Sequence, residues 1–314
     1  MVESKHQWKA WLYLLPCLIL LAVFTVWPIF NTLRMAFLEG YSGIQAAGGT
    51  TFKFGIGNFT KVIQYKNFIS CLKTTVILTF LTVPLSTILA LLISVCLNAI
   101  KPLQKLLQTI FFLPYVTNTI AIGMVFAAMF NIVGSFYGTE NQIIVTAGII
   151  NNILGWFGFS PINWINVGSS YFNNMVVMII YIVWNALPFK ILILLGGLQS
   201  VNKQYYDAAK VDGTSKARVF TRITVPLLSP MIAYVIITGF IGGFKEYSSI
   251  VGVFGENMGP AGAKGQLNTM VGFIYDSLAN NHQGRASAAA LILFVIILIV
   301  TLLQLYVQKK RVHY

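Results

Sequence analysis

The sequence predicts an all-α polytopic membrane protein with six transmembrane helices. Of the 314 residues, 57% are hydrophobic and only 9% are charged, a composition outside the range of soluble domains. The hydrophobic residues form several runs of about 20, the length of helix that crosses the hydrocarbon core of a bilayer. Most of the charged residues lie between those runs, as in membrane proteins whose loops are charged and whose helices are not.

The apolar runs divide the chain into elements. We expect a cytoplasmic N-terminal tail over residues 1–10, a transmembrane domain over 11–308 and a cytoplasmic C-terminal tail over 309–314. The first run is too long for the core of a signal peptide and is expected to be a retained helix. Pro84 and Pro114 fall inside expected helices, where neighbouring helices can satisfy the freed carbonyl groups. The expected spans are residues 11–33, 74–97, 107–131, 174–197, 228–250 and 287–308.

The basic residues between the spans favour an orientation with both termini in the cytoplasm. In that orientation the cytoplasmic segments hold twelve Lys and Arg residues and the outer segments hold seven, in line with the excess of basic residues that cytoplasmic loops carry. The first outer loop, with five bases, opposes this orientation. The outer loop 134–173 has no Lys or Arg and agrees with it. Within that loop, residues 141–157 are expected to form a short helix on the outer surface, too short to cross the membrane.

Several other protein classes are disfavoured. The net charge of +13 does not indicate nucleic-acid binding, because the basic residues flank apolar runs. Cys17, Cys71 and Cys96 lack the spacing of metal ligands. The sequence contains no GxxxxGK[ST], HExxH or GxSxG motif, so we expect no enzymatic activity and no cofactor or metal in this chain.

A short polar stretch, residues 203–230, lies between two apolar blocks. Ala and Tyr residues around Asp207 favour a helix, and Gly213 can adopt the left-handed conformation that ends a helix and turns the chain. A second helical run follows, and Pro226 and Pro230 mark the start of the next apolar block. We predict a helix–turn–helix elbow, basic on its outside, at the membrane surface. Its charged residues are Lys203, Asp207, Lys210, Asp212, Lys216, Arg218 and Arg222.

The same stretch resembles a family signature. Permease subunits of bacterial ABC importers carry Glu-Ala-Ala, three residues, Gly, nine residues and then Ile-x-Leu-Pro in their last large cytoplasmic loop. The residues from Asp207 to Gly213 and from Ile223 to Pro226 fall at those spacings, with Asp207 in place of Glu and Val225 in place of Leu. The resemblance implies that the elbow, over 203–226, docks on a separate ATPase. The residues that it implies for docking are Tyr206, Asp207, Ala208, Ala209, Lys210, Asp212, Gly213, Lys216 and Arg218.

Stretches throughout the chain are similar to the carbohydrate branch of these permeases, which contains the larger maltose permease and the glycerol-phosphate permeases. They include LYLLPCLILLAVFTVWPIF, GIINNILGWFG and QLNTMVGFIYDSL, and the last resembles the first-type permease of such pairs. One departure is Met258-Gly259-Pro260, where the family usually has Gly-Gly-Pro. The resemblance implies the type I ABC importer permease fold and the import of an oligosaccharide or related carbohydrate.

The resemblance also implies an assembly in a bacterial inner membrane. The expected partners are a second homologous permease, two cytoplasmic ABC ATPase subunits, an extracytoplasmic solute-binding protein, the carbohydrate substrate and the lipid bilayer. ATP and Mg²⁺ are expected on the ATPase subunits, consistent with the missing phosphate-binding loop in this chain.

Charged residues inside the expected helices point to a substrate site. A charge near the centre of a bilayer costs about 2.5–3.5 kcal/mol and should face protein or water. Lys190 is expected to extend to the cytoplasmic surface, whereas Glu246 either lines a cavity or pairs with Lys245. Aromatic rings stack on sugar rings while amides and carboxylates bind hydroxyl groups, although aromatic residues at helical spacing are more often packing residues. The candidate substrate-binding residues are Tyr181, Trp184, Asn185, Phe244, Glu246 and Tyr247.

Two other functions remain open at the level of sequence. An ion-coupled secondary transporter of a small polar solute would need no ATPase, but such carriers often show internal repeats and several buried acids. The sequence shows no repeat, and Glu246 is the one acid within the expected helices. For the third class, a channel or a structural membrane subunit, the sequence shows no ring of selectivity residues. Copurification with ATPase subunits and a second permease distinguishes all three classes.

Overall fold

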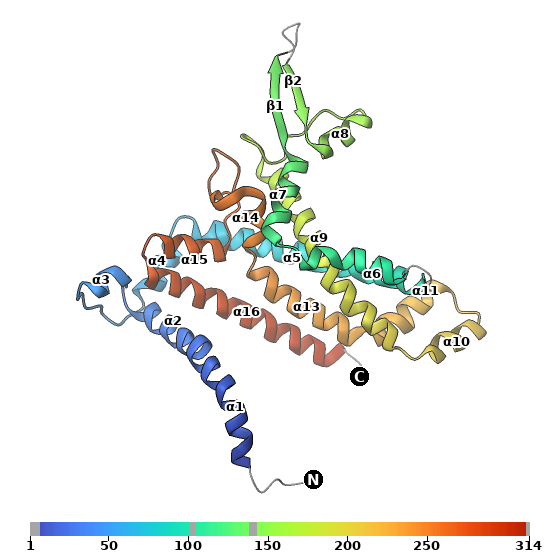
Figure 1. Cartoon of the computed structure of the whole chain (residues 1–314), viewed down its shortest axis with the longest axis horizontal. Coiled ribbons are helices and arrows are strands. Elements are labelled where there is room, and N and C mark those ends of the chain that lie inside the picture. Colours follow the sequence, from blue (N-terminus) through green and yellow to red (C-terminus); the bar gives the residue numbers. More distant parts are fainter. Residues whose placement is uncertain (1–6, 101–103, 138–142, 312–314) are drawn as a thin grey trace. The chain divides into compact units, whose positions relative to one another are not determined.

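The structure, a computed structural model, describes residues 7–100, 104–137 and 143–311 (Figure 1). The described residues do not include most of the two expected tails or the first two residues of the expected surface helix. They also do not include Lys5 and Lys101. The chain forms two compact units. The first combines the residues up to 69 with residues 273–294, and the second combines residues 70–272 with those from 295 onward.

The first unit begins with a long apolar helical run. α1 (Gln7–Leu21), the π-helical segment η1 (Ala22–Val26) and α2 (Trp27–Phe37) follow one another without a break, and the expected span 11–33 lies inside them. Pro28 explains the π turn, because proline cannot donate the hydrogen bond that a regular α-helix needs at that position. The side chains of residues 8–30 are exposed, which leaves this helix free to contact lipid or another subunit.

The rest of the first unit is built from short helices and the start of a long one. α3 (Gly43–Ala47) and α4 (Gly57–Gln64) follow α2, and α15 (Met270–Ala279) precedes α16 (Gln283–Arg311). α16 contains the expected span 287–308 and continues into the second unit.

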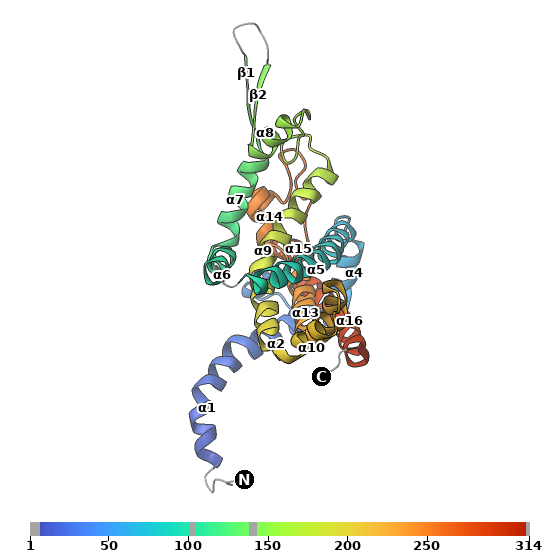
Figure 2. The ribbon, with the colours of Figure 1, turned by 90° about the vertical axis from the view of Figure 1, so that its right-hand side faces the viewer.

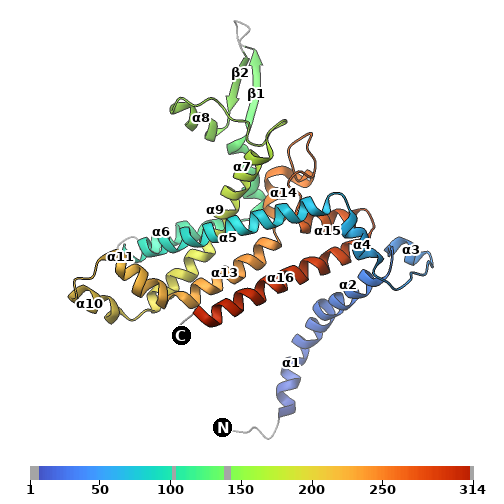
Figure 3. The ribbon, with the colours of Figure 1, turned by 180° about the vertical axis from the view of Figure 1, so that it is seen from behind.

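The second unit has a core of three long helices, α5 (Phe68–Ala99), α9 (Tyr171–Ser200) and α13 (Ser229–Phe244), which lie side by side in Figures 1 and 3. Ala90 of α5, Leu194 of α9 and Val235 of α13 are fully buried in one apolar cluster. A second cluster surrounds Tyr181 and Met178 on α9. The expected spans 74–97 and 174–197 lie inside α5 and α9.

The expected span 107–131 is a bent pair of helices. α6 (Gln104–Phe112) continues into the 3₁₀ segment η2 (Leu113–Val116), and the chain then turns by 99° into α7 (Thr119–Phe130). Pro114 precedes the turn, and the Asn118 side chain caps α7 by accepting hydrogen bonds from the N–H groups of Ile120 and Ala121. The expected span is therefore not one straight helix, because an effective cap begins a new helix in its middle.

The expected span 228–250 is also interrupted. The elbow helices α10 (Lys203–Val211) and α11 (Lys216–Val219) are followed by the π segment η3 (Phe220–Thr224) and α12 (Val225–Leu227), and the chain bends by 67° into α13. α13 ends at Phe244, and α14 (Ser248–Phe254) starts after a break, followed by the 3₁₀ turn η4 (Gly255–Asn257). Within the described residues, four helices are long and apolar enough to cross a membrane, or six if each bent pair is one span.

The long segment 134–173 holds an element that the sequence did not predict. β1 (Ile132–Tyr137) pairs antiparallel with β2 (Ile143–Ala147), and the hairpin continues directly from α7 in Figure 2. A helix follows only at α8 (Ile149–Trp156). The expected surface helix over 141–157 is thus wrong in its first half, where the β-branched run Ile-Ile-Val-Thr forms a strand, as such residues favour.

Candidate functional site

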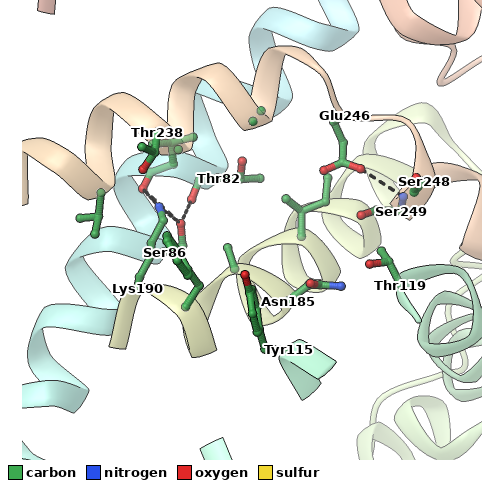
Figure 4. Close-up of a pocket in the computed structure, with 18 residues that line it drawn as sticks. Thr82, Ser86, Tyr115, Thr119, Asn185, Lys190, Thr238, Glu246, Ser248 and Ser249 are labelled. Atoms are coloured by element: carbon green, nitrogen blue, oxygen red, sulfur yellow. Dashed lines mark hydrogen bonds between the residues drawn. The ribbon is translucent and has the colours of Figure 1, made fainter. Parts of the chain in front are cut away.

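A cavity of about 380 Å³ lies inside the second unit. Its walls come from α5, η2, the start of α7, α9, α13 and the start of α14, as Figure 4 shows. Lys190 lies at one end and Glu246 at the other, with Asn185 between them. The remaining polar groups of the lining are mostly hydroxyls, including those of Thr82, Ser86, Thr119, Thr238 and Ser248.

Lys190 is held inside the protein by oxygen atoms of α5. It is only 5% exposed, and its Nζ donates hydrogen bonds to the carbonyl oxygen of Val83 at 3.1 Å, to Ser86 Oγ at 2.7 Å and to Thr87 Oγ1 at 2.9 Å. These three contacts use the three donors of an ammonium group. The expectation that Lys190 extends to the cytoplasmic surface is therefore wrong, because α5 supplies enough oxygen atoms to replace water.

One of the oxygen atoms that Lys190 contacts, Ser86 Oγ, belongs to a hydroxyl stripe along α5. Thr75, Thr79, Thr82 and Ser86 follow at spacings of four, three and four, which places them on one helical face, and all four are buried. Each hydroxyl donates to the carbonyl four residues earlier, so none is left unpaired in the apolar helix. The same spacing is visible in the sequence KTTVILTFLTVPLSTI, although the candidates predicted from the sequence include no Ser or Thr.

Glu246 occupies the break between α13 and α14. Its Oε1 accepts hydrogen bonds from the backbone N–H groups of Tyr247 and Ser249, both at 3.1 Å. The carboxylate thus caps α14, where unpaired N–H groups favour a negative charge. An ion pair with Lys245, the alternative that the sequence left open, is not observed among the described residues. Glu246 also lines the cavity, so the cap fixes an acceptor group on its wall.

Asn185 joins the cavity to the core beside it. Its Nδ2 donates to the hydroxyl of Tyr181 at 3.3 Å, and that hydroxyl donates to the carbonyl of Thr119. Tyr181 itself is fully buried against Phe126 and does not belong to the lining. Tyr181 therefore orients the Asn185 amide, and Asn185 is the residue of this pair that a solute in the cavity can reach.

The other candidate residues lie away from the cavity lining. Trp184 is 36% exposed and packs against Phe126, with ring centroids 5.1 Å apart. Phe244 is buried and meets Phe80 edge to face, while Tyr247 packs against the apolar cluster around Tyr181. Of the six candidates, Asn185 and Glu246 line the cavity. Lys190 and hydroxyl groups of α5 line it as well.

This arrangement suits a solute with many hydroxyl groups. Hydroxyl and amide groups both donate and accept hydrogen bonds, and a carboxylate accepts several. Tyr115 adds an aromatic ring at the wall. The cavity volume falls within the range of small-molecule sites.

The elbow has the local structure that its sequence predicts. α10 starts at the cap of Asn202, whose Oδ1 accepts from Gln204 N at 3.0 Å, and Gly213 follows with φ +66°. The predicted left-handed conformation of Gly213 is confirmed. Thr214 N donates back to Ala209 O at 2.9 Å and Gly213 N to Lys210 O at 3.2 Å, closing the turn at the end of α10.

Most of the predicted docking residues are exposed on the elbow. Ala209 is buried. Tyr206 is half-buried, and its hydroxyl lies 3.4 Å from Thr224 Oγ1, so Tyr206 holds α10 against η3. The neighbouring Val211 is 89% exposed, an apolar side chain on a charged surface. The elbow thus presents charged and apolar groups together, as protein interfaces do. The exposed docking residues are Asp207, Ala208, Lys210, Asp212, Gly213, Lys216 and Arg218.

The chain matches a known protein family and several named permeases. The profile of the family described as "Binding-protein-dependent transport system inner membrane component" matches residues 53–313. The chain is 29% identical over 298 residues to the arabinooligosaccharides transport system permease protein AraP of Bacillus subtilis, covering 94% of this chain and 87% of that protein. It is also 29% identical to the lactose permease LacF of Rhizobium radiobacter, covering 99% and 97%, and to the trehalose/maltose permease MalF of Thermococcus litoralis, covering 99% and 98%.

Solved structures share the fold. A chain of a bacterial ABC transporter that imports the acidic polysaccharide alginate superimposes with a TM-score of 0.77 at 21% identity, covering 98% of this chain and 96% of that chain. The predicted fold class, a helical permease of the type I ABC importer fold, is confirmed.

Proposed function

Because the chain belongs to the family of binding-protein-dependent transport system inner membrane components, we propose that it is the permease subunit of an ATP-driven carbohydrate importer. The observation that carries the substrate class is the cavity, in which hydroxyl groups, the Asn185 amide and the Glu246 carboxylate form the polar wall. The names of the relatives agree with it, since they transport arabinooligosaccharides, lactose and trehalose or maltose. In this proposal the chain forms half of the translocation pathway and a second permease forms the other half.

The elbow connects this pathway to the energy source. ATP and Mg²⁺ are bound by two separate ATPase subunits, and α10 seats in a cleft of one of them. α9 ends at Ser200, and only two residues separate it from α10, which begins at Lys203. A movement of the elbow is therefore passed directly to the helix that carries Asn185 and Lys190. Closure of the ATPases on ATP then moves α9 and opens the pathway toward the binding protein, which delivers the carbohydrate. The surface charges Lys210, Lys216 and Arg218 steer docking.

Purification from the native membrane tests the proposal. We expect two ATPase subunits and a second permease to copurify with this chain, and the complex to hydrolyse ATP faster when a sugar-loaded binding protein is added. A chain that purifies alone and transports solute under an ion gradient without ATP would instead be a secondary transporter, which contradicts the proposal.

The orientation can be tested by cysteine labelling in a background without Cys17, Cys71 and Cys96. Ser160 and Ser215 are both exposed, and Ser215 makes no side-chain cap on α11, so both positions accept cysteine. Because residues 134–173 have no bases and the elbow has five, we expect a membrane-impermeant maleimide to label Ser160→Cys in intact cells. Ser215→Cys should react only after the membrane is opened. The reverse pattern would place the elbow outside and exclude its contact with a cytoplasmic ATPase.

A further inference from the structure

A second cavity, of about 340 Å³, lies in the first unit between α4, the turn after α2 and the start of α16. Its lining contains two permanent cations, Lys61 and Arg285, together with His282. None of the described residues that line it is acidic. The nearby carboxylate of Glu39 is engaged elsewhere, because its Oε1 accepts from Gly57 N at 2.9 Å. The cavity is therefore a cationic site.

The walls of this cavity are fixed by hydrogen bonds. Asn58 is 1% exposed, and its Nδ2 donates to Leu38 O at 2.7 Å and to Ala36 O at 3.0 Å. Its Oδ1 accepts from Gly40 N at 3.0 Å. These contacts join α4 to the end of α2, and a bond from Gly284 N to Tyr41 O at 3.0 Å joins the start of α16 to the same turn. Such a site keeps its shape without a ligand.

Arg285 is held in one orientation. Its guanidinium lies over the ring of Tyr65, 4.8 Å from the centroid, and its Nε donates to Ser277 Oγ at 3.2 Å. A guanidinium has five N–H donors in a planar fork, so the two terminal NH₂ groups remain to bind two oxygens of one anion. Phosphate and carboxylate groups fit this fork.

The cavity lies at the level where apolar helices end. α2 ends at Phe37, three residues before Gly40, and the apolar part of α16 begins directly after Arg285. Large apolar side chains of the same unit are exposed around α3 and α4, among them Phe54 at 77% and Ile44 at 66%. Cations and tyrosines beside exposed apolar side chains are typical of the interface between hydrocarbon and head groups. This position also gives a reason for Lys61, one of the five bases of the first outer loop that oppose the expected orientation.

We propose that this cavity binds the phosphate of an anionic phospholipid head group. Arg285 contacts two phosphate oxygens, Lys61 supplies a second positive charge, and Tyr41 and Tyr65 lie beside the glycerol region. The acyl chains extend along the exposed apolar side chains of the unit. Those side chains favour a lipid over an acidic residue of a soluble partner, which would leave them in water.

The test uses the assembled transporter with its partner subunits, reconstituted in a mixture of phosphatidylglycerol and phosphatidylcholine. After extraction in mild detergent, native mass spectrometry measures how much of each lipid stays bound. We expect the unchanged complex to retain phosphatidylglycerol preferentially. Lys61→Gln and Arg285→Gln should each weaken this retention about five-fold, the equivalent of about 1 kcal/mol for one basic residue near an anionic surface.

The matched control is Lys66→Gln, which removes the same charge from an exposed residue outside the lining and should leave retention unchanged. Lys61 is exposed, so its substitution keeps the fold and the test remains decisive if Arg285→Gln fails to assemble. Unchanged retention in Lys61→Gln would overturn the proposal. If inorganic phosphate displaces phosphatidylglycerol equally well, the ligand is a free anion and the proposal is overturned. If the variants lose affinity for the binding protein while they retain the lipid, the cavity binds an acidic protein partner instead. These readouts do not depend on transport, so the inference can fail without the proposed function failing.

Discussion

Gly213→Val is expected to lower ATP-coupled uptake by roughly 5–30-fold while the complex still inserts in the membrane. Gly213 has φ +66°, and a side chain in this left-handed region costs about 1–2 kcal/mol, which changes the population of the native turn by that factor. A Cβ at this position would meet no atom within 4 Å. The effect therefore comes from the backbone alone and stays local to the elbow. ATP hydrolysis and sugar uptake, measured together in proteoliposomes, check the expectation.

Gly213→Asn is the matched control, because asparagine tolerates the left-handed conformation much better than valine does. We expect it to retain most of the uptake. If the Val variant shows normal uptake and normal stimulation of hydrolysis by the binding protein, the elbow is not the coupling element. Equal loss in the Val and Asn variants would point to the glycine surface itself as a contact of the ATPase.

Glu246→Gln is expected to lower sugar uptake by about 10–100-fold. A hydrogen bond to a charged group contributes roughly 1.5–3 kcal/mol, and each 1.4 kcal/mol is tenfold in affinity. Glutamine keeps an oxygen for the N–H groups of Tyr247 and Ser249, so the start of α14 remains capped and the change is confined to the charge on the cavity wall. Asn185→Ala should reduce uptake in the same direction by a smaller factor, because a neutral hydrogen bond contributes about 1 kcal/mol.

The control is Glu256→Gln, which removes the same charge from an exposed residue of η4 and should transport normally. ATP hydrolysis stimulated by the binding protein should persist in the cavity variants, since the elbow is unchanged. Normal uptake and selectivity in both Glu246→Gln and Asn185→Ala would show that this cavity is not on the substrate path.

Residue type predicted which side chains line the cavity for some of the candidates and not for others. Asn185 and Glu246 were predicted because polar groups in an apolar helix need a partner or a cavity. Trp184 and Phe244 were predicted on the same ground of suitable chemistry, yet they pack against Phe126 and Phe80. An aromatic side chain is stable both in an apolar core and at a cavity wall, so residue type alone does not predict which of the two it occupies.

The sequence by itself determined the features that depend on local or compositional physics. Apolar runs of the length of a bilayer core form the long helices, and Gly213 turns the elbow because a residue without Cβ adopts positive φ at little cost. The spacing from Asp207 to Pro226 identified the family before any contact was known. The break before α7, the burial of Lys190 among the oxygens of α5 and the cap that Glu246 places on α14 were decided only by the tertiary structure. Each of these features depends on which groups of other segments come within hydrogen-bond distance. Where such groups replace water, a helix can stop or a charge can be buried. Where they do not, the helix continues and the charge stays exposed.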